Sequence, residues 1–191
     1  MENTIPKSKQ IRINALKLFT RNEINFGVKG IKTLDNLGFF TAPASTKYHG
    51  AYEGGLFDHS IATARELVNL TNKLGLKWER PASPYIVGLF HDLCKCDNYV
   101  KIDSFDEIAP VGIKYKHSPN LIINGHGEKS VIMLQRLIPL TDEEIACIRW
   151  HMGAYEIDTR LWDYYGRAIE KYPNVLYTHT ADMIASRIVG V

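Results

Sequence analysis

The sequence predicts an all-α protein: one helical domain with room for a small β-hairpin. Three observations support this fold class. Apolar residues recur at helical spacing along most of the 191 residues, glycine and proline interrupt that spacing at intervals, and 45% of the residues are hydrophobic, enough for one core. No internal repeat or long linker divides the chain. We therefore expect a single domain over 1–191, with an N-terminal helical extension (1–42) and a core (43–187).

Two helices are predicted before the first long loop. Residues 8–22 carry apolar side chains at helical spacing among basic ones. A shorter helix over 28–37 should end at Gly38, because glycine readily adopts the left-handed conformation that ends a helix. The stretch 39–57 contains a proline and several glycines and is predicted to be an ordered loop.

The next two helices are expected to be central. The first begins at Asp58 or Ser60 and ends near Gly75. The second begins at Ser83-Pro84, because serine can cap a helix and proline suits its first position. It reads YIVGLFHDLCK and is nearly all apolar, which is typical of a buried helix.

The segment 97–123 is predicted to be irregular, apart from a hairpin in IKYKHSPNLII with its turn at Ser118-Pro119-Asn120. Because loops on a rigid scaffold often carry specificity, we expect this segment to shape a binding pocket. Thr141 followed by Glu144 is a capping-box pattern and predicts a helix start. The remaining helices are expected at 127–137, 142–152, 160–171 and 175–189.

Charge and cysteine content exclude several classes of protein. The 23 basic and 21 acidic residues give a net charge of +2, so there is no global attraction to nucleic acid or to a membrane. Three cysteines are too few for a disulfide scaffold, and we expect reduced thiols in a cytoplasmic protein. No apolar run is long enough for a signal peptide or a membrane span, so no membrane partner is expected.

Residue types that bind metals occur in five separate segments: His59, the adjacent His91 and Asp92, His126, His151, and Asp182. Each alone is more often a core or capping residue. However, a charged aspartate in so apolar a helix is costly to bury without a partner, and a cation removes that cost. Six nitrogen and oxygen donors exceed the need of one ion and suffice for two that share a carboxylate. Such a pair of ions can activate water against a phosphoester.

The order His, His-Asp, His, His, Asp resembles the HD superfamily of metal-dependent phosphohydrolases. Members with two metals, such as cyclic-di-GMP phosphodiesterases of the HD-GYP type, add two histidines roughly 25 residues apart to the His, His-Asp and Asp of one-metal members. His126 and His151 have this spacing. The resemblance implies a dinuclear site in which Asp92 bridges the two ions. One ion would take His59, His91, Asp92 and Asp182, and the other Asp92, His126 and His151.

The segment PASTKYHGAYEGGLFDHSIATA is similar to the HD domains of bacterial 3′–5′ exoribonucleases and of conjugative relaxases, as is ADMIAS. This resemblance covers residues 43–187. The sequence shows no OB-fold, relaxase or helicase portion, so a small nucleotide or a short oligonucleotide is the expected substrate. Imidazole and carboxylate ligands suit two divalent ions chosen from Mn²⁺, Fe²⁺, Ni²⁺, Co²⁺ and Zn²⁺.

The resemblance implies hydrolysis of a nucleotide or oligonucleotide phosphoester by a metal-bridging hydroxide, with Asp92 and Lys95 as catalytic residues. Lys95 matches the lysine of the family's His-Asp-x-x-Lys motif. It follows His91 by four residues, so on a continuous helix it would share that face and could grip a phosphate oxygen. A solvated lysine at a helix C-terminus is the alternative. Further candidate substrate contacts are Arg149, Lys129, His49 and Glu53, for which surface solvation or loop packing are the alternatives.

Three other functions remain open at this point. The nearest is a nucleoside mono- or triphosphate phosphohydrolase of the same superfamily. The same ligand order also occurs in di-iron oxygenases, and a non-catalytic HD module could bind a nucleotide as a signal. The products formed, the oxygen consumed and the metal bound distinguish these functions.

Overall fold

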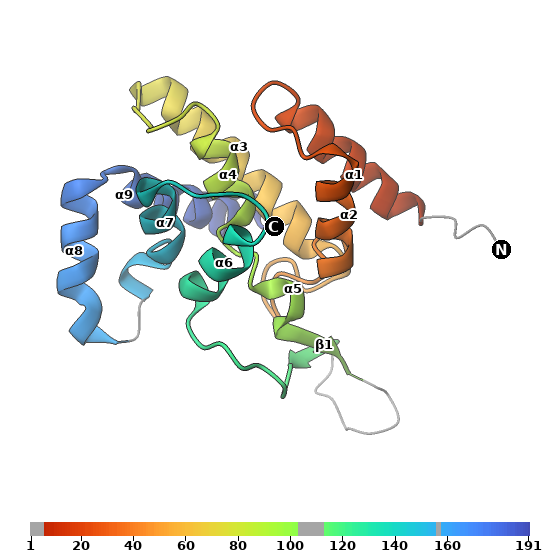
Figure 1. Ribbon diagram of the computed structural model, residues 1–191. Helices are drawn as coiled ribbons and strands as arrows, with labels where there is room; N and C mark the ends of the chain where they lie inside the picture. Colours follow the sequence, from red (N-terminus) through yellow and green to blue (C-terminus); the bar gives the residue numbers. More distant parts are fainter. Residues whose placement is uncertain (1–5, 103–112, 156–157) are drawn as a thin grey trace.

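The computed structural model describes residues 6–102, 113–155 and 158–191. Within them the chain is mostly helical, with one small antiparallel pair of strands (Figure 1). The predicted fold class is confirmed. No helix in the described ranges has both the length and the apolar content to cross a membrane.

The elements follow one another as α1 (Lys7–Thr20), α2 (Gly27–Leu37), α3 (Gly55–Leu74), α4 (Ser83–Phe90), α5 (Lys95–Asn98), β1 (Tyr99–Lys101), β2 (Tyr115–His117), α6 (His126–Gln135), α7 (Asp142–Arg149), α8 (Trp162–Lys171) and α9 (Asn174–Ile184). Two 3-10 turns, η1 (Gly153–Tyr155) and η2 (Thr159–Leu161), lie between α7 and α8. A π-helical turn, η3 (Ala185–Val189), continues α9.

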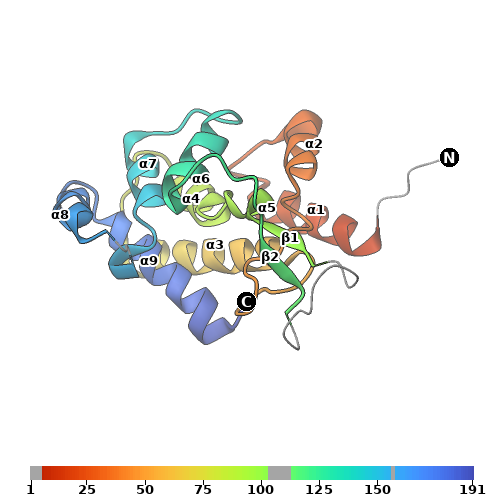
Figure 2. The same ribbon diagram turned by 90° about the horizontal axis from the view of Figure 1, so that it is seen from below.

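Helices α3 and α4 pack closely and form the centre of the molecule. Figure 2 shows α3 running through the middle, with α4 and α9 against it. The approach of α3 to α4 depends on Gly88, because a Cβ atom there would overlap the backbone of Ala64. Helices α6 and α7 pack on each other, and α7 also contacts α4 and α9.

An aromatic cluster fixes the loop between α2 and α3. Phe39 and Phe40 are fully buried, and the Phe39 ring centroid lies 5.5 Å from that of Phe90 and 5.8 Å from that of Phe57. Such tilted and edge-on contacts are favourable arrangements for aromatic rings. The loop beyond these two residues is therefore anchored to α3 and α4 before it reaches His49.

Helix α3 begins at Gly55, earlier than the predicted Asp58 or Ser60. Gly54 has φ of +84°, a left-handed conformation that favours glycine, and a Cβ atom at Gly55 would overlap the backbone of Gly50. The two glycines thus let the loop close tightly onto the first turn of the helix. Gly38 ends α2 at φ of +89°, as predicted.

Two predictions about caps have different outcomes. Thr141 and Glu144 form the predicted capping box at the start of α7, with both reciprocal hydrogen bonds present. Ser83 does not cap α4. Its hydroxyl instead donates to Oε1 of buried Glu144 at 2.8 Å, and Arg80 donates to the same carboxylate. A buried carboxylate needs such donors, and this demand outweighs the local capping preference.

The predicted continuous helix through His91 and Lys95 is wrong, because α4 ends at Phe90 and a turn precedes α5. The ring of His91 bonds the carbonyl of Gly88 at 2.9 Å, and the amide of Cys94 donates to the hydroxyl of Ser130. These bonds draw backbone groups away from helical pairing, so the turn holds Asp92 next to α6.

The predicted hairpin has the wrong partner strand. Strand β2 pairs with β1, with Tyr99 opposite His117 and Lys101 opposite Tyr115, rather than with residues beyond Ser118-Pro119-Asn120. Most of the chain that joins the two strands, 103–112, lies outside the described residues. The pairing partner therefore lies upstream in the sequence, at Tyr99–Lys101.

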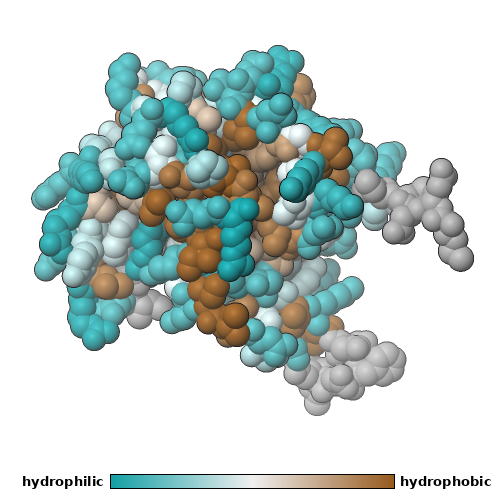
Figure 3. All heavy atoms as spheres, viewed as in Figure 1, coloured by the Kyte–Doolittle hydropathy of each residue, from teal (hydrophilic) through white to brown (hydrophobic). Residues whose placement is uncertain are grey.

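The face seen in Figure 3 is mainly hydrophilic, with a band of hydrophobic side chains down its middle. Ile122, just before α6, is 96% exposed, and Leu121 and Ile132 are 39% exposed each. Exposed apolar residues are normal on protein surfaces when they are scattered, and a continuous band is less common.

Candidate metal centre

The fold brings the six predicted metal ligands together from five segments. His59 lies in α3, His91 and Asp92 in the turn after α4, and His126 begins α6. The other two are His151, directly after α7, and Asp182 in α9. Their donor atoms form overlapping triads within 4.8 Å: His59, His91 and Asp92; His91, His151 and Asp182; and Asp92, His126 and His151. These buried triads could hold one or two metal ions.

Close backbone packing brings His126 and His151 together. A Cβ atom at Gly127, the second residue of α6, would overlap the backbone of Arg149 at the end of α7. The first turn of α6 therefore lies directly against the residues that precede His151. As a result the two imidazole centroids are 5.5 Å apart.

Main-chain carbonyls orient three of the four histidines. Nδ1 of His59 lies 2.9 Å from the backbone oxygen of Val191, that of His91 lies 2.9 Å from Gly88, and that of His151 lies 2.7 Å from Ile148. A carbonyl oxygen only accepts hydrogen bonds, so each Nδ1 carries the proton. In a neutral imidazole, Nε2 is then left with a lone pair, which is the form in which histidine binds a metal.

The lone pairs converge without a proton between them. Nε2 of His59 and Nε2 of His91 are 3.2 Å apart, and two unprotonated nitrogens cannot hydrogen-bond each other. Nε2 of His151 is buried and has no hydrogen-bond partner among the described residues. Two nitrogen ligands about 2.0–2.1 Å from one cation lie about 3.0–3.4 Å apart. A shared cation would therefore satisfy these nitrogens.

The carboxylate of Asp92 has one oxygen toward each side of the cluster. Oδ2 is 3.5 Å from Nε2 of His59 and 3.4 Å from Nε2 of His91. Oδ1 is 2.7 Å from Nε2 of His126 and 3.5 Å from Nε2 of His151. A carboxylate that bridges two ions needs this arrangement. That Asp92 does so stays a prediction.

Both acidic groups are ionised at neutral pH. Burial by itself would raise the pKa of Asp92, but Lys95, His91 and His126 hold it well below its usual range. The pKa of Asp182 is likewise lowered despite burial, by its contacts with His59 and His91. The donors therefore include two negative charges in a buried site, which favours a cation there.

Lys95 contributes its charge at the centre of the site. Its ammonium lies 2.6 Å from Oδ2 of Asp92, and only 9% of its side chain is exposed. Burial would lower the pKa of Lys95, but the charge of Asp92 raises it. The alternative of a solvated lysine at a helix end is therefore excluded.

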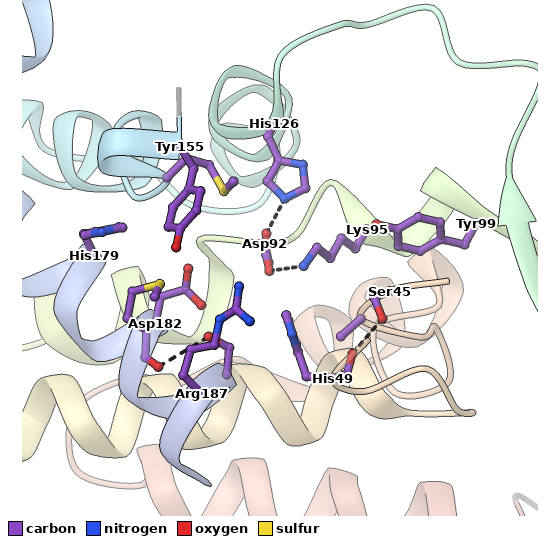
Figure 4. A pocket seen from close by; sticks show the side chains of 14 residues that line it. Ser45, His49, Asp92, Lys95, Tyr99, His126, Tyr155, His179, Asp182 and Arg187 are labelled. Carbon is purple, nitrogen blue, oxygen red and sulfur yellow. Dashed lines mark hydrogen bonds and ion pairs between the residues drawn. The ribbon is translucent and has the colours of Figure 1, made fainter. Parts of the chain in front are cut away.

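A cavity of about 270 Å³ opens beside these groups (Figure 4). Asp92, His126, Asp182 and His49 line it, with Lys95 next to Asp92. Burial, followed by the charges of His59 and Lys95, lowers the pKa of His49 to about 4, so this imidazole is neutral at pH 7. Asp92 faces the open space, so a ligand in the cavity would lie against the donor cluster.

Two of the predicted substrate contacts, Lys95 and His49, line the cavity, and the other three do not. The ammonium of Lys129 bonds Asp97 and, at 2.8 Å, Asn98. Arg149 pairs with Glu128 at 2.6 Å and lies over the ring of Trp150. Nearby carboxylates thus hold both cations away from the cavity.

Glu53 is exposed on the loop before α3, and its carbonyl accepts a hydrogen bond from Arg12 at 3.1 Å. The guanidinium of Arg12 also bonds the carboxylate of Asp58 in the first turn of α3. Glu53 therefore belongs to the attachment of α1 to the loop, and it does not reach the cavity wall.

Several cavity residues were not predicted. Tyr155 comes from η1, and a further group lies along the last helix: His179, Met183, Ser186 and Arg187, beside Asp182. Their spacing of three and four residues places them on one helix face, a signal that was present in the sequence. Only the position of α9 against α3 shows that this face lines the cavity.

His126 differs from the other three histidines in what holds its ring. Its Nδ1 lies 3.5 Å from Sγ of Cys94, and no main-chain carbonyl fixes it among the described residues. Burial, then the charge of Asp92, raises the pKa of the Cys94 thiol to about 12, so this group is a thiol at neutral pH. Its weak hydrogen bond orients His126 less firmly than a carbonyl would.

Comparison of the chain with models of known protein families, with curated proteins and with solved structures found no match in any of the three. The structure shows a helical protein with a buried cluster of histidine and aspartate side chains that could hold metal.

Proposed function

We propose that this protein is a metal-dependent phosphohydrolase of the HD type that cleaves the phosphoester of a small nucleotide or a short oligonucleotide. One observation carries the proposal. Four imidazoles surround the two oxygens of Asp92, and Nε2 of His59 lies 3.2 Å from Nε2 of His91, beside an open cavity. Such a donor set is suited to divalent cations such as Mn²⁺, Fe²⁺, Co²⁺, Ni²⁺ or Zn²⁺.

In this proposal His59, His91, Asp92 and Asp182 hold one ion, and Asp92, His126 and His151 hold the second. Divalent ions bound there would supply a water of lowered pKa and positive charge next to the phosphoryl group. The protein fixes the positions of the donor atoms, because hydrogen bonds to main-chain oxygens orient the imidazole rings of His59, His91 and His151 before an ion binds.

Lys95 and Asp92 act together in this proposal. The ammonium of Lys95, 2.6 Å from Asp92, keeps the carboxylate ionised and oriented for binding. It also adds positive charge at the wall of the cavity, where the phosphoryl group would carry its negative charge. The role of Lys95 is thus first to position Asp92 and only then to contact substrate.

The size of the cavity supports a small substrate. Pockets for small molecules typically measure about 300–1,000 Å³, and this one is about 270 Å³. The cavity therefore favours a substrate at the small end of this range. A long strand would have to run over the surface outside it.

Metal analysis and hydrolysis of a panel of phosphate mono- and diesters, with protein purified without chelator, test the proposal. We expect bound metal and metal-dependent hydrolysis in the wild type. His91→Ala and Asp92→Ala should lose metal and at least about 100-fold in rate, because metal catalysis is worth several kcal/mol. His117→Ala is the control, since His117 is an exposed residue of β2.

Hydrolysis that persists in Asp92→Ala after the metal is lost would refute this mechanism. Product analysis then assigns the ester: a nucleoside monophosphate indicates a diester substrate, whereas pyrophosphate or triphosphate indicates a nucleoside triphosphate. Consumption of oxygen by an iron-loaded sample that hydrolyses no ester would replace the proposal with an oxygenase.

A further inference from the structure

The last helix supplies one wall of the cavity. His179, Asp182, Met183, Ser186 and Arg187 line it, and they follow the spacing of a single helix face. The π-helical turn η3 carries Ser186 and Arg187, and turns of this kind are frequent at functional sites. Arg187 therefore lies on the same face as the predicted ligand Asp182, one turn further along the chain.

The side chain of Arg187 reaches into the cavity. Figure 4 shows its guanidinium between Asp182 and His49, on the side from which Asp92 faces the open space. Among the described residues that line the cavity, Lys95 and Arg187 are the only lysine or arginine side chains. Both cations thus lie where a phosphate bound next to Asp92 would have its oxygens.

These two cations differ in whether the protein already neutralises them. The ammonium of Lys95 is 2.6 Å from Asp92. Within the described residues, no hydrogen bond or ion pair joins the guanidinium of Arg187 to another group. Four other arginines do pair with carboxylates: Arg12 with Asp58, Arg80 with Glu144, Arg149 with Glu128 and Arg160 with Asp158.

We infer that Arg187 binds the phosphate group of the substrate, an inference that rests on the proposed function of this site. The guanidinium presents a planar fork of N–H donors that matches two phosphate oxygens, and it keeps its charge at any physiological pH. Arg187 contacts the non-bridging oxygens from the side of α9, while the groups around Asp92 face the phosphorus. The substrate class is a phosphoester with an accessible anionic oxygen.

Binding of inorganic phosphate to the metal-loaded full chain, measured by isothermal titration calorimetry, tests this inference directly. Arg187→Ala should raise the dissociation constant for phosphate by about 10- to 100-fold, since hydrogen bonds to charged groups are strong. Arg187→Lys keeps the charge without the fork and should lie between that variant and the wild type.

Arg160→Ala is the matched control, because Arg160 pairs with Asp158 and its side chain is 87% exposed. It should bind phosphate like the wild type. Metal content and thermal stability should be unchanged in all three variants, because Arg187 is an exposed residue and is not one of the six predicted ligands.

The measurements distinguish failure of the Arg187 assignment from failure of the proposed function. If Arg187→Ala binds phosphate as tightly as Arg160→Ala, or if the wild type binds none, the assignment of Arg187 is overturned whatever the protein hydrolyses. If phosphate binding depends on Arg187 but no phosphoester is hydrolysed, the proposed function fails and the anion site stands. If both hold, the KM for the ester should rise in Arg187→Ala.

Discussion

At the residue scale, the site depends on how each imidazole is held. The Nδ1–H groups of the imidazoles each donate a hydrogen bond to a main-chain oxygen in three cases: His59, His91 and His151. Their Nε2 atoms therefore point into the cluster before any ion binds. His126 has only the thiol of Cys94 beside its Nδ1. We therefore expect the two sides of Asp92 to differ in affinity, with the His126 side the weaker.

This difference gives a prediction about metal content. His126→Ala should lose one of two bound ions and keep the other, because His59, His91 and Asp182 remain in place. His59→Ala should lose the tighter ion, and Asp92→Ala both. The measurement is the metal-to-protein ratio by elemental analysis after dialysis. Complete loss of metal in His126→Ala would contradict a site with two separable ions.

The electrostatic environment of the same residues could be predicted only in part. An aspartate in an apolar segment signalled a buried charge in need of a partner, and Asp92 is 2% exposed. Lys95 was expected to face the substrate, whereas its ammonium lies on Asp92. Lys129 and Arg149 are held by Asp97 and Glu128 instead of reaching the cavity. Spacing along a helix cannot show which of several nearby carboxylates captures a long, flexible side chain.

At the element scale, the crossing of α3 and α4 sets the distance between His59 and His91. Gly88 lies against Ala64 at this crossing, and the carbonyl of Gly88 also accepts the bond from His91. The glycine therefore has two roles: it allows the close approach of the helices, and it helps to orient a predicted ligand.

Gly88→Ala should lower the free energy of unfolding by about 1–3 kcal/mol, because the added methyl overpacks the crossing. Urea denaturation of the metal-free protein measures this cost. The control is Gly166→Ala in α8, where a Cβ atom would meet nothing within 4 Å. Alanine there should be neutral or stabilising, since it is the better helix former. Equal stability of the two variants would show that the helices do not approach as closely as described.

Element boundaries were predicted best where a local signal had no competitor. Gly38, Gly75 and the Thr141 capping box end or begin helices as expected. The prediction of a continuous helix through His91 was wrong because tertiary hydrogen bonds, such as the one from Cys94 to Ser130, replace helical ones. The predicted partner of β2 was wrong for a related reason: strand pairing is decided between segments that need not be neighbours in the sequence.

At the scale of the whole molecule, the candidate site connects most of the helices. Its six predicted ligands come from α3, α6, α9 and the segments directly after α4 and α7. The same helices enclose the hydrophobic core, to which α1 and α2 add Ile13, Leu16, Ile31 and Leu34. An ion bound by groups so far apart in the sequence would bind the folded chain much more tightly than the unfolded one.

Metal should therefore stabilise the entire fold. Free ion at about 100 times its dissociation constant adds about 2.7 kcal/mol, or about 5–10 °C in Tm for a chain of this size. Thermal denaturation with and without a chelator measures the shift. Asp92→Ala should show no shift on addition of metal. A wild type whose Tm ignores both chelator and added ions would show that the cluster binds none.

The sequence by itself determined the fold class, most of the helices and the set of six residues, because helical periodicity and the chemistry of histidine and aspartate are local properties. Only the tertiary structure decided which other side chains join these six. It turned Lys95 onto Asp92, removed Lys129 and Arg149 to other partners, and brought Arg187 to the cavity wall. The physical reason is that charges and hydrogen-bond donors take the nearest partner in space, and distance in space follows from how the helices pack.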